Sequence, residues 1–272
     1  MLVRFWGVRG STPTPQRSHL RYGGNTPCLE VRTRYGLFVF DCGSGLRLLG
    51  HALRKEFGRR RIRARVFLSH YHWDHIQGIP FFSPLYAKEN HFLFHSFRSE
   101  ETSVRRALEE QMTDPYFPVN MSVMQAHRRF HEIGEGRHAY DGLVIHTRRL
   151  NHPQGCLGFR VEYKKRVFVY ATDNEPGDPE GDRNVRWLAQ DADALVYDAQ
   201  YTPEEYETSR KTWGHSHWKE GVAIARECRV KKLILFHHDP DHNDRDVDSI
   251  LRHAKRHFRA TVAAREGLTI NL

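Results

Sequence analysis

Hydrophobic and polar positions follow two different periods along this chain. Short runs rich in β-branched and aromatic residues are typical of strands, and apolar residues three or four positions apart are typical of helices. The predicted strands are Leu2–Val8, Cys28–Thr33, Leu37–Asp41, Arg65–Ser69, Phe92–Phe97, His127–Ile133, Leu143–Leu150, Leu157–Tyr163, Val167–Ala171, Ala194–Asp198, Lys232–Phe236, Ala260–Ala263 and Leu268–Asn271. The predicted helices are Leu46–Phe57, Glu100–Met112, Asn184–Gln190, Trp218–Cys228 and Val247–Phe258. Many strands in the first half and strand–helix alternation in the second predict an α/β fold of two sheets between helices.

The composition adds limits to this picture. The 272 residues contain no Pro/Gly/Ser-rich tether, internal repeat or low-complexity tract, so we expect a single domain over residues 1–272. No apolar window reaches the length of a membrane span, and the N-terminus lacks the apolar stretch of a signal peptide. The four cysteines are scattered, which favours free thiols in a reducing compartment. We therefore expect a soluble, cytoplasmic protein with no membrane partner.

The formal net charge of +9 favours anionic partners. The densest basic segment, Arg54–Arg65, has two interpretations: a nucleic-acid contact, or a helix C-terminus followed by a solvated turn, where cations complement the helix dipole. The second interpretation is favoured, because only Phe57 places an aromatic ring among the basic side chains.

A cluster of metal-ligating residue types follows the predicted strand Arg65–Ser69, namely His70, His72, Asp74 and His75. Residues two apart in an extended segment point to the same side, so His70 and His72 can bind one ion. After the following turn, Asp74 and His75 can face a second ion or a bound water. Neutral imidazoles, a carboxylate and an open coordination position are what metal-assisted hydrolysis needs. The alternative, a His-rich surface loop, is disfavoured by the position directly after a hydrophobic strand.

Further polar residues stand at the ends of other predicted strands, where α/β proteins usually build their sites. Each one alone has an ordinary explanation as a helix cap or an exposed side chain. Together with the first cluster they form an ordered set that extends over most of the chain. The set comprises Asp41, His152, Asp173, Asp198 and His237.

The order and spacing of these residues, from Asp41 to His237, resemble the metallo-β-lactamase superfamily. The resemblance implies an αββα four-layer sandwich with a site for two divalent metal ions at one edge. It assigns the first ion to His70, His72, His152 and Asp173, and the second to Asp74, His75, Asp173 and His237. Asp173 would bridge the two ions, and Asp41 would orient ligands without binding metal. Zinc (Zn2+) is the favoured metal, and manganese (Mn2+) suits the same nitrogen and oxygen ligands.

The tripeptide Gly214–Ser216, just before a predicted helix, resembles the His-Ser segment of the phosphodiesterase branch of this superfamily. That branch includes RNase Z-type tRNA-processing enzymes and cyclic-nucleotide phosphodiesterases. The resemblance implies that His215 contacts the scissile phosphate and acts as general acid, held by Asp198, while Asp74 orients the nucleophile. The absence of a cysteine from the ligand set also fits this branch. The alternative makes Ser216 a helix N-cap and leaves His215 and His217 exposed.

The interval between His152 and Asp173 bears on the expected substrate. RNase Z enzymes commonly carry a long arm there that clamps tRNA, but here the interval is filled by two predicted strands and a turn at Lys164–Arg166. Several segments also resemble bacterial cyclic-nucleotide phosphodiesterase-like proteins, namely Gly7–Pro13, Tyr22–Thr26, Ile76–Phe82 and Pro115–Pro118. We therefore expect a small anionic phosphodiester as the substrate, a cyclic nucleotide first of all. An RNase Z-like endonuclease acting on RNA is the alternative.

Two other classes stay open. A lactonase or thioesterase of the same superfamily would not need His215, and a nucleotide-binding protein without turnover is disfavoured by the complete ligand set. The resemblance is compatible with a homodimer, since proteins of this branch are often dimers.

Other residues have two interpretations each. Asn25 and Thr26 either line the pocket or belong to a turn with positive φ. Aromatic residues are candidates for stacking a base, although we expect most of them in the core. These are Phe81, Phe82, Tyr116, Phe117 and Trp213.

Overall fold

The computed structural model describes residues 1–140 and 142–272. The strands are β1 Leu2–Gly7, β2 Cys28–Thr33, β3 Gly36–Phe40, β4 Arg63–Phe67, β5 His91–Ser96, β6 His127–Glu132, β7 Gly136–Tyr140, β8 Leu143–Leu150, β9 Cys156–Tyr163, β10 Arg166–Ala171, β11 Ala194–Asp198, β12 Leu233–Phe236, β13 Thr261–Ala263 and β14 Thr269–Asn271. The α-helices are α1 Gly45–Phe57, α2 Trp73–Ile76, α3 Val104–Glu110, α4 Pro179–Ala189, α5 Pro203–Glu205, α6 Trp218–Glu227 and α7 Asp244–His257, and a π-helical turn spans Tyr206–Arg210. Short 3₁₀ turns lie at Arg17–His19, Ile79–Phe81, Ser83–Tyr86 and Met121–Val123.

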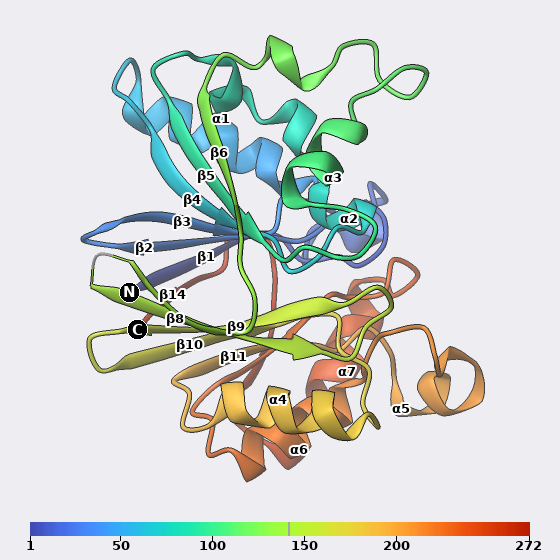
Figure 1. Ribbon diagram of the computed structural model, residues 1–272. Helices are drawn as coiled ribbons and strands as arrows, with labels where there is room; N and C mark the ends of the chain where they lie inside the picture. Colours follow the sequence, from blue (N-terminus) through green and yellow to red (C-terminus); the bar gives the residue numbers. More distant parts are fainter. Residues whose placement is uncertain (141) are drawn as a thin grey trace.

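Two seven-stranded sheets pack face to face and carry helices on their outer sides (Figure 1). The order of the first sheet is β14-β1-β2-β3-β4-β5-β6, and the order of the second is β13-β12-β11-β10-β9-β8-β7. The two chain ends meet at one edge, where the terminal ammonium of Met1 donates to the carbonyl of Leu272 at 2.6 Å. This arrangement confirms the αββα four-layer sandwich expected from the sequence.

Three apolar layers hold the sandwich together. Aromatic rings fill the space between the sheets, where Phe40 stacks on Phe67 and meets Phe159 edge-on, with 5.3 Å between centroids in each pair. The outer face of the first sheet packs against α1 and α3, and that of the second against α4, α6 and α7. Each helix therefore buries one apolar stripe and leaves its other side to solvent, as amphipathic helices do.

Parallel strands decide where the polar residues gather. Strands β3 to β6 are parallel to one another, as are β10 to β13, so their carboxyl ends reach the same edge of each sheet. Asp41 and His237 directly follow β3 and β12, and Asp173 comes two residues after β10; each adopts a positive φ, at 57°, 60° and 55° respectively. The chain leaves each strand through a left-handed turn at the residue whose side chain enters the site.

The element limits differ from the sequence prediction where caps and edges decide them. Helix α4 begins earlier than expected, because Asp178 caps it by accepting from the amide of Gly181 at 2.7 Å. Helix α7 also begins earlier, at a cap formed by Asn243. Strand β7 was not predicted, because its sequence, GRHAY, has no apolar alternation and mostly exposed side chains.

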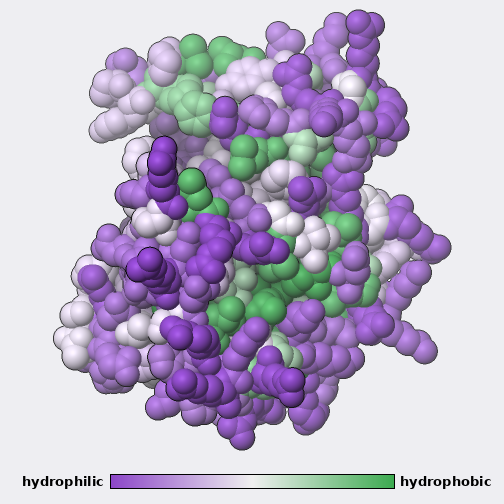
Figure 2. All heavy atoms as spheres, turned by 180° about the vertical axis from the view of Figure 1, so that it is seen from behind, coloured by the Kyte–Doolittle hydropathy of each residue, from purple (hydrophilic) through white to green (hydrophobic). Residues whose placement is uncertain are grey.

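The outer surface is largely polar. Viewed from behind, it is mainly hydrophilic, with hydrophobic residues gathered near the centre (Figure 2). In the part of the chain that the structure describes, no helix has the length and apolarity needed to cross a membrane. All four cysteines are free and buried, as the scattered spacing predicted.

Candidate metal centre and active site

The seven side chains predicted as metal ligands converge at the carboxyl edge of the two sheets. Asp173 lies at their centre. Its Oδ1 is 3.9 Å from Nε2 of His70 and 3.8 Å from Nε2 of His152. The same oxygen is 3.5 Å from Nε2 of His237, while Oδ2 is 3.3 Å from Nε2 of His75. One carboxylate thus faces imidazoles that come from both sheets.

The ligand atoms form two groups around Asp173. In the first group are His70, His72 and His152, with Nδ1 of His72 3.0 Å from Nε2 of His152. In the second are Asp74, His75 and His237, whose ligand atoms all lie within 4.8 Å of one another. Ligands of a tetrahedral ion at about 2.0–2.1 Å would stand roughly 3.3 Å apart. The observed spacing therefore fits one divalent ion in each group.

The hydrogen bonds of the imidazoles support the same conclusion. Nδ1 of His152 lies 2.7 Å from the carbonyl of Gly214, and Nδ1 of His237 lies 2.9 Å from Oε1 of Gln200. These partners fix each ring so that Nε2 faces the interior of the site. Among the described residues, the buried Nε2 atoms of His70 and His75 have no hydrogen-bond partner. Buried nitrogens of this kind need a partner, and a metal ion supplies one.

Asp41 is buried beside the site and engaged on both oxygens. Its Oδ2 lies 2.8 Å from Nδ1 of His75 and accepts from the Tyr170 hydroxyl at 2.6 Å. Ser69 donates through its amide to Oδ1 at 2.7 Å and through its hydroxyl to Oδ2 at 2.8 Å. Burial, reinforced by the charge of Asp41, raises the pKa of Tyr170 well above its usual value, so the phenol stays a donor. This geometry fits the orienting role expected of Asp41.

The charges of the site suit cation binding. Burial alone would raise the pKa of Asp173, but His237 and His75 hold it well below its usual value. Burial is likewise outweighed at Asp74, where His75 and His237 keep the pKa low. Burial lowers the pKa of His152 to about 4 and that of His70 far below normal, so both rings are neutral. Burial would lower the pKa of His75, but Asp74 and Asp173 outweigh it and raise that pKa well above its usual value. Charged carboxylates and neutral imidazoles are the forms that bind metal, so His75 must lose a proton when an ion binds.

A second pair, His215 and Asp198, stands beside the ligand groups. Nδ1 of His215 is 2.9 Å from Oδ2 of Asp198 and 3.6 Å from Oδ1 of Asp173. Burial lowers the pKa of His215, but Asp198 outweighs it and raises the pKa to about 9. The alternative in which Ser216 caps the next helix is wrong, because His217 is the N-cap of α6 and accepts from Glu220 N at 3.2 Å.

Sequence reasoning missed several groups that position the ligands. The amide of Ser11 donates to Oδ2 of Asp74 at 2.9 Å. Gly10 lies so close to His237 that a Cβ there would stand 2.5 Å from the ring. These contacts, like that of the Gly214 carbonyl, depend on the backbone, so they cannot be predicted from the residue types in the sequence. Gln200 is a side-chain contact, but nothing in its local sequence separates it from an ordinary polar residue.

The other candidate residues have mixed outcomes. Phe82 is buried and Phe117 partly so, but Phe81, Tyr116 and Trp213 are 56%, 84% and 54% exposed. The expectation that most of these rings pack in the core is therefore wrong.

Asn25 and Thr26 serve the backbone around them. Asn25 donates to Glu266 at 3.0 Å, and Thr26 accepts from the amide of Ser44 at 2.7 Å. Gly23 next to them has φ of 105°, which favours the turn interpretation. In the basic segment Arg54–Arg65, Arg60 donates to the carbonyl of Glu56 at 2.8 Å. The first part of this segment therefore forms the C-terminal end of a helix, as the second interpretation expected.

Residues 37–238 match the family model described as the beta-lactamase superfamily domain. The match covers more than half of the chain, so the chain belongs to the beta-lactamase superfamily. The resemblance seen in the sequence is confirmed at this level.

Relatives and solved structures agree with this family. Ribonuclease Z of Lactococcus lactis subsp. cremoris (strain SK11) is 26% identical over 298 residues, covering 87% of this chain and 88% of the relative. The metallo-beta-lactamase fold protein YhfI from Bacillus subtilis is 19% identical with a TM-score of 0.72, covering 99% of this chain and 98% of its own. The short form of human tRNase Z is 19% identical with a TM-score of 0.69, covering 100% of this chain and 99% of its own. The likeness in fold extends over the whole chain.

Proposed function

We propose that this chain is a phosphodiesterase that hydrolyses a small anionic phosphodiester, such as a cyclic nucleotide. It works with two divalent metal ions, of which zinc is the favoured metal. The observation that carries the proposal is the His215–Asp198 pair, 2.9 Å apart, beside Asp173, which would hold both ions. The metal ligands alone suit hydrolysis of many bonds. A cationic imidazole beside them adds a proton donor and a counter-charge for a phosphate.

The residues divide the reaction among them. His70, His72 and His152 would hold one ion, Asp74, His75 and His237 the other, and Asp173 both. When bound, the ions supply Lewis-acid activation of water and of the phosphoryl group. Asp74, fixed by the amide of Ser11, accepts a hydrogen bond from the attacking water.

His215 completes the step at the leaving group. Its Nδ1 is engaged by Asp198, so Nε2 is the nitrogen that faces the substrate. As the bond from phosphorus to the leaving oxygen breaks, the proton on Nε2 passes to that oxygen. Asp198 stabilises the imidazolium before the transfer and holds the ring in place throughout.

Two observations support a small substrate. Strands β9 and β10 pair directly, with Tyr163 opposite Arg166, and they fill the interval in which RNase Z enzymes commonly carry a tRNA-clamping arm. The alignment with the Lactococcus lactis ribonuclease Z covers 298 residues, more than the 272 of this chain, so the relative has segments that this chain lacks. The names of the relatives favour RNA as the second candidate substrate. The free cysteines favour a reducing compartment such as the cytoplasm.

Replacing the bridging carboxylate tests the proposal. Asp173→Ala should remove the second ion, measured as metal per chain by mass spectrometry, and abolish hydrolysis of bis-p-nitrophenyl phosphate. A panel of 2′,3′-cyclic, 3′,5′-cyclic and linear dinucleotides should then identify the substrate of the unaltered enzyme. Asp191→Ala, at an exposed aspartate paired with Arg229, is the control and should leave both readouts unchanged. Turnover retained by Asp173→Ala would refute the scheme.

A further inference from the structure

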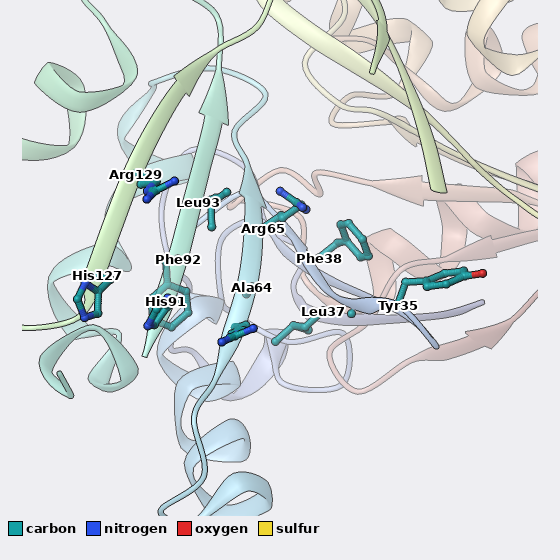
Figure 3. A pocket seen from close by; sticks show the side chains of 12 residues that line it. Tyr35, Leu37, Phe38, Ala64, Arg65, His91, Phe92, Leu93, His127 and Arg129 are labelled. Carbon is teal, nitrogen blue, oxygen red and sulfur yellow. The ribbon is translucent and has the colours of Figure 1, made fainter. Parts of the chain in front are cut away.

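A groove of about 520 Å³ lies on the first sheet, away from the candidate active site. It is formed where β4, β5 and β6 begin, and Figure 3 shows Arg65, His91, His127 and Arg129 around it, with Tyr35 to one side. Arg63 also lines it. None of the described residues that line the groove is acidic.

Strand register places the basic side chains in rows across the sheet. Arg63 pairs with His91, which pairs with His127. Two residues further along, Arg65 is in register with Leu93 and Arg129. Alternation along a strand puts both rows on one face, with about 6.6 Å between them. Cations from β4 and β6 thus border the groove on two sides.

Two arginines that line the groove, Arg63 and Arg129, are available to a ligand. Burial and then the positive charges of His127, Arg61, Arg63 and Arg129 lower the pKa of His91 below its usual value. Within residues 1–140 and 142–272, Arg63 and Arg129 form no ion pair, and both are exposed. The field of the groove therefore favours an anion with several charges.

Aromatic surface lies at one end of the groove. Tyr35 is 43% exposed, and the guanidinium of Arg34 stands 4.6 Å from its ring centre. On the other side Arg65 lies over the ring of Tyr140 at 4.8 Å, which orients its charged end. Arginines along a groove together with an exposed ring for base stacking are typical of surfaces that bind single-stranded nucleic acid.

We propose that this groove is a second, non-catalytic site that binds single-stranded RNA through its phosphates, with Tyr35 stacking on a base. Arg63 and Arg129, on strands at the two sides of the groove, suit two phosphates along a strand, which a nucleoside monophosphate does not offer. His70 lies seven positions after Arg63, or about 23 Å along an extended chain. The groove therefore lies apart from the candidate active site, and RNA bound in it is a ligand whether or not the enzyme cleaves it.

Fluorescence anisotropy with a labelled oligouridylate tests this site on the metal-loaded chain. The wild type should bind with a dissociation constant that rises steeply between about 50 and 200 mM salt. The double variant Arg63→Glu/Arg129→Glu should bind about tenfold more weakly or worse, with a salt slope smaller by about 1.4 for two lost phosphate contacts. Tyr35→Ala should weaken binding and leave the slope unchanged. Hydrolysis of bis-p-nitrophenyl phosphate should stay at the wild-type level in both of these variants.

The control is Arg252→Glu/Arg256→Glu on α7, which changes the net charge equally on exposed positions of the other sheet's outer layer. It should bind the oligonucleotide nearly as well as the wild type. Equal loss in both double variants would mean that only net charge matters and would overturn the proposal. Wild-type affinity in Arg63→Glu/Arg129→Glu would overturn the proposal too. Displacement of the RNA by poly-glutamate at equal charge would also overturn it, because that result would assign the groove to an acidic protein.

Discussion

Asp41 follows strand β3 and His75 lies in helix α2, and Oδ2 of Asp41 lies 2.8 Å from Nδ1 of His75 with both side chains fully buried. With its proton on Nδ1, the imidazole leaves the Nε2 lone pair free to bind an ion. The carboxylate therefore decides which tautomer His75 adopts, although Asp41 is not itself among the expected ligands.

Asp41→Asn should weaken binding of the second ion more than it weakens the fold. An amide nitrogen facing His75 would draw the lone pair to Nδ1 and put the proton on Nε2, where no metal can bind. We expect a loss of about 10–100-fold in metal affinity, measured by competition with a chelator. Asp41→Ala should in addition lower the stability by about 3 kcal/mol or more, because buried donors lose their acceptor. Unchanged affinity in Asp41→Asn would contradict the orienting role.

His215→Ala should separate chemistry from metal binding. The side chain is not among the seven expected ligands, so the metal content should match the wild type. We expect kcat for a phosphodiester to fall about 10²–10⁴-fold, the usual effect of losing a general acid. His217→Ala is the nearby control, since it removes a contact with the Tyr206 ring and a helix cap, the cap being worth about 1 kcal/mol of stability. An ester or lactone that is hydrolysed equally well by wild type and His215→Ala, at rates above those for phosphodiesters, would favour the lactonase or thioesterase class instead.

The candidate site could be predicted because its residue types follow apolar strands. Asp41, Asp173 and His237 each come directly after a buried run, and parallel pairing carries such positions to one edge. The contacts of Ser11 and Gly214 could not be predicted, since they are made by backbone atoms whose placement depends on the tertiary fold.

The remaining errors in the fold also have physical causes. Strand β7 lies at the edge of the second sheet beside β8, and its sequence has no hydrophobic alternation from which a strand could be predicted. Tyr116 and Trp213 are large aromatic residues that the composition rule places inside, yet both are mostly exposed. Exposure of a ring in a loop depends on which elements cover it, and that is not a local property of the sequence.

Gly10→Ala should disturb the second ligand group through packing alone. The new methyl group would stand 2.5 Å from Nδ1 of His237, where Gln200 holds the ring. We expect the ring to shift, with lower occupancy of the second ion and a drop in turnover of about 10-fold or more. Gly134→Ala is the matched control, because a Cβ there meets nothing within 4 Å. Metal analysis and phosphodiester assays of both variants measure the difference, and equal behaviour of the two would show that this close approach is unimportant.

His95→Phe should make the fold less sensitive to acid. His95 is 3% exposed, stacks on Phe67 at 4.7 Å, and has no hydrogen-bond partner on either ring nitrogen among the described residues. Burial, aided by the charges of His131 and Arg65, lowers the pKa of His95 to about 3. Since the unfolded chain protonates this residue near pH 6.5, its contribution to stability is complete above that pH and is lost as the pH falls toward 3.

The loss amounts to at most about 1.4 kcal/mol per pH unit. Urea unfolding at pH 7.5 and 5.0, with chelator present so that metal release does not contribute, should therefore show a decline in stability that is smaller by about 2 kcal/mol in His95→Phe than in the wild type. The phenyl ring keeps the stacking on Phe67, so stability at pH 7.5 should be equal or higher. His131→Phe, at an exposed ring 5.2 Å from His95, should retain most of the wild-type acid sensitivity. An equal decline in His95→Phe and wild type would show that the buried imidazole does not limit stability in acid.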